Sequence, residues 1–64
     1  MKLNRDKVEL ARARKQMTVS DLAETYGVSR ARINVILNQR EVTTNCAGRI
    51  AAALGCDVTE LLED

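Results

Sequence analysis

The chain has 64 residues, with ten basic and nine acidic side chains and a net charge of +1. A chain of this length forms one small domain, which buries only about 60% of the surface that the unfolded chain exposes. It has no histidine, no carboxylates paired on one helix face and no phosphate-binding glycine loop, which argues against an enzyme. It also lacks a bilayer-spanning apolar run and a signal-peptide pattern, so we expect no membrane partner.

The first helix is predicted over about residues 5–15, with Asn4 as its N-cap. Val8 and Ala11 share one face at helical spacing and should point into the core. Leu10 lies off that stripe, so it should either meet the C-terminal segment or stay exposed.

Two short helices joined by a tight turn follow, over residues 18–26 and 29–38. Thr18 is placed to cap the first of them, and Asp21 can return a hydrogen bond to the backbone of Thr18. Gly27 ends that helix in the left-handed conformation, and Ser29 caps the next one. The two apolar stripes are formed by Val19, Leu22, Ala23 and Tyr26, and by Ile33, Ile36 and Leu37. This order of helix, glycine turn and capped helix is typical of a helix-turn-helix.

A fourth helix is predicted over residues 44–54, capped by Thr43 or Thr44 and stopped by Gly55. Gly48 inside it costs about 1 kcal/mol relative to alanine, and a close approach of another helix is the expected reason. Its inward-facing residues are Ala47, Ile50, Ala51 and Leu54.

A last short helix is predicted over residues 58–62, where Asp57 and Glu60 mark its start. The five helices together predict an all-α, single-domain fold over residues 1–64. Cys46 and Cys56 have no histidine partner, so they fit neither a zinc site nor a redox pair. We expect two free thiols in a reducing cytoplasm, with no metal, cofactor or small-molecule ligand.

Charge is distributed unevenly along the chain. Residues 1–56 hold all ten basic residues and five acidic ones, a net of +5, whereas the last eight residues hold four acids. From Thr25 to Arg40 there are three arginines and no acid. The pattern indicates either a basic face for a polyanion or an ordinary solvated surface.

Two motifs carry a family resemblance: L-A-E-x-x-G-V-S-R-x-x-I-x-x-x-L-N from Leu22 and I-A-A-A-L-G-C-D-V-T-E-L-L from Ile50. In this order they resemble the lambdoid phage repressor and Cro-like helix-turn-helix (Xre) family, over about Val8 to Leu62. The resemblance implies a compact five-helix, lambda-repressor-like domain. It also implies that the third helix enters the DNA major groove, usually in a dimer on a two-fold operator.

The sequence departs from the family pattern in three places. Gln39 stands where glycine often ends the third helix. Leu37 stands where many members carry a glutamate that pairs with an arginine of the first helix, so Arg12 is expected to be free for a phosphate. The loop beyond Arg40 is not basic, so its phosphate contacts should be fewer or neutral.

The outward face of the third helix supplies the predicted base-reading residues Arg30, Ala31, Asn34 and Val35. Arg30 matches a base-reading position of the resembling repressors and fits guanine O6 and N7; the alternative is a phosphate clamp. Val35 either packs on a thymine methyl or is an exposed valine without a partner. The predicted phosphate contacts are Thr18, Val19, Ser20, Ser29, Arg32, Asn38, Arg40, Thr43, Thr44 and Asn45.

The predicted function is therefore a sequence-specific, double-stranded DNA-binding transcriptional regulator, and most simply a repressor. A homodimer, formed in solution or only on the DNA operator, would use Val58, Leu61 and Leu62. The alternative is a helical protein–protein interaction module that docks through Val35 and Leu10 and does not bind DNA.

Overall fold

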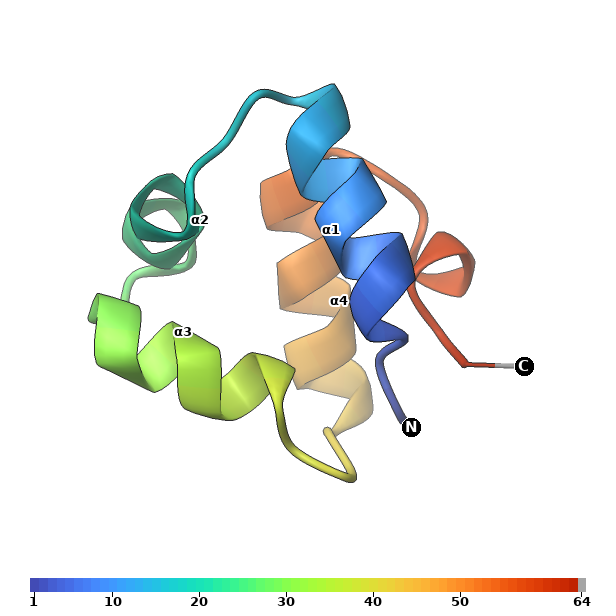
Figure 1. The fold of residues 1–64 in the computed structure, drawn as a ribbon. Coiled ribbons are helices and arrows are strands. Elements are labelled where there is room, and N and C mark those ends of the chain that lie inside the picture. The colour runs from blue at the N-terminus through green and yellow to red at the C-terminus, as the bar shows by residue number, and fades with distance from the viewer. Residues whose placement is uncertain (64) are drawn as a thin grey trace.

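The computed structural model describes residues 1–63. Over this range it contains four α-helices and one short 3-10 turn (Figure 1), with the bounds α1 Arg5–Arg14, α2 Val19–Tyr26, α3 Arg30–Leu37, α4 Thr44–Leu54 and η1 Val58–Glu60. The only strand-like pairing among the described residues is an isolated antiparallel bridge between Leu3 and Leu62. The all-α class is confirmed. None of these helices is long and apolar enough to cross a bilayer.

A side chain predicted as a cap begins each α-helix. The four caps accept the backbone N–H three residues later, and they are Asn4, Thr18, Ser29 and Thr43. Thr43, rather than Thr44, therefore caps α4. At α2 the capping box is complete, because Asp21 also accepts the backbone N–H of Thr18 at 2.9 Å. These local hydrogen bonds explain why the helix starts could be predicted within one residue.

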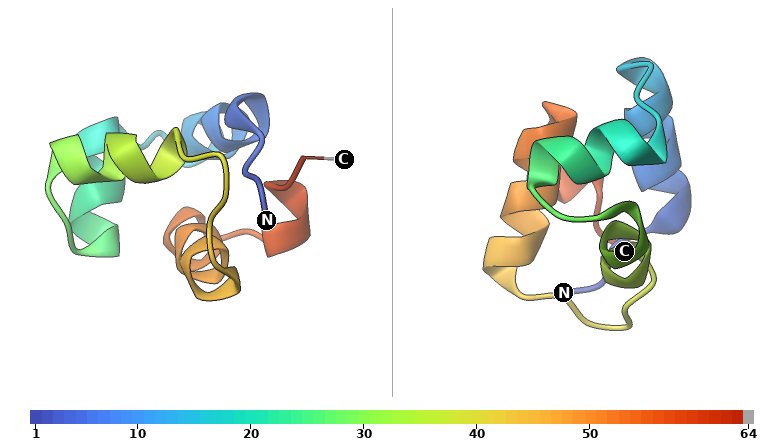
Figure 2. Two further views of the ribbon diagram at one scale, coloured as in Figure 1. Left: turned by 90° about the horizontal axis from the view of Figure 1, so that it is seen from below. Right: turned by 90° about the vertical axis from the view of Figure 1, so that its left-hand side faces the viewer.

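The predicted fifth helix is not confirmed, because only Val58–Glu60 form a 3-10 turn. The backbone beyond this turn pairs with the N-terminal segment instead of continuing a helix. The N–H of Asn4 donates to the carbonyl of Leu61 at 2.7 Å, and the N–H of Glu63 donates to the carbonyl of Lys2 at 2.9 Å. The two ends of the described chain therefore lie side by side (Figure 2).

The core is aliphatic and takes a side chain from almost every element. Its largest fully buried side chains are Val8, Leu22, Ile33, Ile50, Leu54 and Leu61, and no polar or charged residue of the described chain is buried. Helix α2 packs against both α3 and α4, and η1 packs against α4. In Figure 1 α2 is seen nearly end-on while α3 runs across the view, so the two helices cross steeply.

The two predicted glycine stops differ from Gly48 in their backbone conformation. Gly27 has φ 95° and Gly55 has φ 67°, the left-handed geometry that ends a helix. Gly48 lies on an exposed part of α4, and a methyl group added there would meet no neighbouring atom within 4 Å. The prediction that Gly48 permits a close helix–helix approach is therefore wrong.

Candidate DNA-binding surface

Helix α3 divides into a buried stripe and an outward face, as its periodicity predicts. Ile33, Ile36 and Leu37 are buried, whereas Arg30, Ala31, Arg32 and Val35 are exposed and Asn34 is half-buried. Val35 is 51% exposed. This fraction is high for a β-branched apolar side chain, whose burial is favourable. The outward face is thus a mixture of arginine, small and apolar side chains.

The arginines around α3 are available to a ligand. Among the described residues, the side chains of Arg30, Arg32 and Arg40 form no ion pair. Helix α3 itself carries no acidic residue. Glu41, the nearest acid along the chain, pairs with the N-terminal ammonium group at 2.7 Å, which lowers the pKa of its carboxyl. The local charge is therefore positive.

The start of α2 offers backbone N–H groups rather than long side chains. The capping box already uses the N–H of Thr18 and that of Asp21, which leaves those of Val19 and Ser20 without a partner among the described residues. Thr18 and Ser20 are exposed, and Val19 packs partly against the core. The Thr18 backbone N–H lowers the pKa of the Asp21 carboxyl, so a negative charge stays beside this helix start.

The fold brings some of the predicted phosphate contacts together and separates others. In the right-hand view of Figure 2, α3 and the start of α2 lie on the same side of the molecule as α1, and α4 lies on the opposite side. Thr43, Thr44 and Asn45 are exposed at the first turn of α4.

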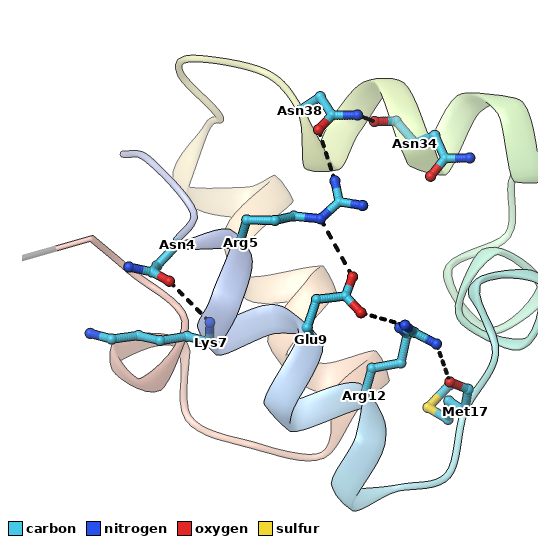
Figure 3. A network of polar contacts seen from close by, with 8 residues as sticks. All are labelled: Asn4, Arg5, Lys7, Glu9, Arg12, Met17, Asn34 and Asn38. Atoms are coloured by element: carbon cyan, nitrogen blue, oxygen red, sulfur yellow. Dashed lines mark hydrogen bonds and ion pairs between the residues drawn. The ribbon is translucent and has the colours of Figure 1, made fainter.

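A ladder of polar contacts runs along α1 and connects both helices of the helix-turn-helix (Figure 3). At one end Arg5 Nη1 donates to Asn38 Oδ1 at 2.8 Å. At the other end Arg12 Nη1 donates to the carbonyl of Met17, just before α2, at 2.8 Å. Glu9 joins the two arginines, because its carboxylate pairs with Arg5 and with Arg12.

These polar contacts correct the prediction for Arg12 and add Arg5 to the candidate site residues. Arg12 is not free for a phosphate, because its guanidinium already pairs with Glu9 and donates to the Met17 carbonyl, and its side chain is only 24% exposed. The Arg12 guanidinium also lowers the pKa of the Glu9 carboxyl. Arg5 was not predicted as a site residue. Its contact with Asn38 spans 33 positions, and no local pattern in the sequence indicates it.

A second cluster ties α4 to the end of α2. Arg49 donates to the carbonyl of Tyr26 at 2.8 Å, and its guanidinium lies 4.1 Å from the centre of the Tyr26 ring. The Tyr26 hydroxyl donates to Cys46 Sγ at 3.5 Å, and this contact raises the tyrosine pKa. Cys46 and Cys56 are free cysteines. No group of potential metal ligands forms a metal site in the part of the chain that the structure describes.

The three predicted dimer residues differ in their burial. Leu61 is fully buried in the core of its own chain, and its backbone carbonyl accepts the N–H of Asn4. Val58 and Leu62 are half-buried and also pack against that core. Only these two side chains keep exposed apolar area, so any contact between protomers here would be small.

Comparison with known proteins identifies the family to which the chain belongs. A model of the Cro/C1-type HTH DNA-binding domain matches residues 7–64. No curated protein and no solved structure matches the chain significantly. The matched region includes all but the first two residues of α1, both helices of the helix-turn-helix, α4 and η1, so the predicted resemblance is confirmed. The chain belongs to the Cro/C1-type HTH DNA-binding domain family.

Proposed function

We propose that this DNA-binding domain is a sequence-specific transcriptional repressor that inserts α3 into the major groove of its operator. The exposed face of α3 carries the proposal. It combines unpaired arginines, an exposed valine and a complete absence of acidic side chains. A helix with these properties suits the DNA major groove, where phosphates lie along both sides and the edges of the bases are exposed between them.

Base reading is assigned to four residues on this face. Arg30 is the first residue of α3, so its guanidinium can reach guanine O6 and N7 ahead of the helix. Val35 and Ala31 lie one turn apart and suit thymine methyl groups, and a valine that gains such a contact removes apolar area from water. Asn34 is half-buried and suits a base edge that it reaches directly or through a water molecule.

Phosphate contacts fix the register of α3 in the groove without reading sequence. The backbone N–H groups of Val19 and Ser20 at the start of α2 suit one phosphate. The remaining assigned contacts lie at the start of α2, around α3 and at the start of α4, and they are Thr18, Ser29, Arg32, Asn38, Arg40, Thr43, Thr44 and Asn45. A set of this kind predicts an affinity that falls with a log–log salt slope of about 0.9 per phosphate neutralised.

Repression would follow if a homodimer covered a promoter on a two-fold operator. The contact between protomers is assigned to the exposed parts of Val58 and Leu62, a surface small enough for the dimer to form only on DNA. Sedimentation at micromolar concentration, with and without the operator, tests this assembly. A single protomer on an operator-sized duplex would contradict it.

A panel of operators tests the base-reading role. The binding sequence is first selected from a random DNA pool, and each base pair is then changed in turn. We expect Arg30→Ala to lose about 1–3 kcal/mol of discrimination at one base pair per half-site. Arg14→Ala removes the same charge from an exposed side chain near Glu60 and should leave discrimination intact. A uniform loss from Arg30→Ala would refute the assignment.

A further inference from the structure

Arg5 joins α1 to the C-terminal end of α3 through a side chain that is still 44% exposed. Its Nη1 donates to Asn38 Oδ1 at 2.8 Å, and its Nε lies 3.4 Å from Glu9 Oε1. The guanidinium plane is therefore fixed at two points, one on α3 and one on α1 (Figure 3). A surface arginine held in this way loses little further side-chain entropy when it binds a ligand.

Both partners in this contact keep hydrogen-bond donors for another group. Arginine has five N–H donors. Arg5 donates one of them from Nη1 to Asn38 and holds Glu9 in an ion pair at Nε, which leaves the donors of Nη2 for another group. The side-chain amide of Asn38 donates one N–H to the carbonyl of Asn34 at 2.8 Å and keeps the other. Both sets of donors belong to side chains that are in contact with each other, and no described acceptor occupies them.

The charge at this position favours an anion. Glu9 is shared between Arg5 and Arg12, so two positive charges face this one carboxylate. The carbonyl groups at the end of α3 carry partial negative charge, and the Arg5 guanidinium compensates it. A planar fork of donors beside a groove-binding helix matches a phosphodiester, which accepts two parallel N–H bonds.

We propose that Arg5 and Asn38 together bind one backbone phosphate of the DNA, and that Glu9 positions the Arg5 guanidinium for this contact. The proposal rests on the proposed function, because the phosphate lies beside the groove that α3 enters. The contact fixes where the C-terminal end of α3 sits in the groove. It therefore affects affinity for all sequences alike.

Fluorescence anisotropy with a duplex selected from the random pool, measured over a range of salt concentrations, tests the proposal. We expect Arg5→Gln to reduce the salt slope by about 0.9 and to weaken binding to every sequence about tenfold. Lys15→Gln is the matched control. It removes one positive charge at the far end of α1, where the Lys15 side chain lies over Gly55, and should keep the wild-type slope.

Two further variants separate the phosphate contact from a structural role. Arg5→Lys keeps the charge but not the fork, so it should keep the salt slope while losing affinity. The double variant Arg5→Gln/Asn38→Ala should lose less than the product of the two single losses, because both residues serve one phosphate. A full salt slope in Arg5→Gln, or strictly multiplicative losses, would overturn the proposal. A wild-type chain that binds no duplex would instead refute the proposed function itself.

Discussion

Gly48→Ala should make the domain more stable, which is unusual for a substitution inside a helix of such a small protein. Gly48 lies in the interior of α4, and an added methyl group meets nothing within 4 Å. The substitution therefore introduces no clash and removes only the entropic disadvantage of glycine, about 1 kcal/mol in a helix interior. For a domain of 60–100 residues this corresponds to a rise in melting temperature of roughly 4–8 °C.

Gly27→Ala is the matched control, because its methyl group also meets nothing within 4 Å. Gly27 has φ 95°, and the left-handed conformation costs an alanine about 1–2 kcal/mol. Thermal unfolding followed by circular dichroism should therefore shift up for Gly48→Ala and down for Gly27→Ala. A lower melting temperature for Gly48→Ala would show that a close contact does require this glycine, and would refute the reasoning.

Other substitutions test the core, the cap and the polar ladder. Leu61→Ala should cost about 2–5 kcal/mol in urea unfolding, because Leu61 is fully buried; an unchanged midpoint would contradict its place in the core. Thr18→Ala should cost about 1 kcal/mol by removing the α2 cap, and a loss below a few tenths would contradict that role. Since Arg12 lowers the pKa of the Glu9 carboxyl below its ordinary value of 4.5, the stabilisation is fully present above pH 4.5 and disappears as the pH falls through the folded-state pKa. Glu9→Gln should accordingly be less stable than the wild type at pH 7 and equal to it at low pH, whereas a pH-independent difference would contradict the pairing. Burial raises the pKa of the Cys56 thiol, so this thiol should react more slowly with a disulfide reagent at pH 8 than free glutathione does; a faster reaction would contradict its burial.

Local signals in the sequence were enough to predict the four α-helices. Each cap acts on a backbone N–H only three residues away, and each apolar stripe repeats within one or two turns. For the same reason the outward position of Val35 could be predicted from its neighbours on α3. The information that fixes these features lies within a few residues of each.

Features that depend on distant parts of the chain could not be predicted in this way. The η1 turn ends because the backbone near Leu61 pairs with the segment near Asn4. The capping pattern at Asp57 is local and does not indicate this pairing. The Arg5–Asn38 bond likewise joins two helices across 33 positions. Arg12 is different, because its partners Glu9 and Met17 lie only three and five positions away. The i, i+3 spacing of Glu9 and Arg12 on α1 was therefore a local signal that could have indicated this pair.

The central claim is that the outward face of α3 contacts DNA. Titration of the ¹⁵N-labelled protein with the selected duplex, followed by two-dimensional NMR, tests this claim most directly. We predict that the largest shift changes fall on backbone amides of residues 28–38 and 18–20, with little change around Leu10, which is exposed on α1. Shift changes concentrated around Leu10 or along residues 58–63, with α3 unaffected, would contradict it.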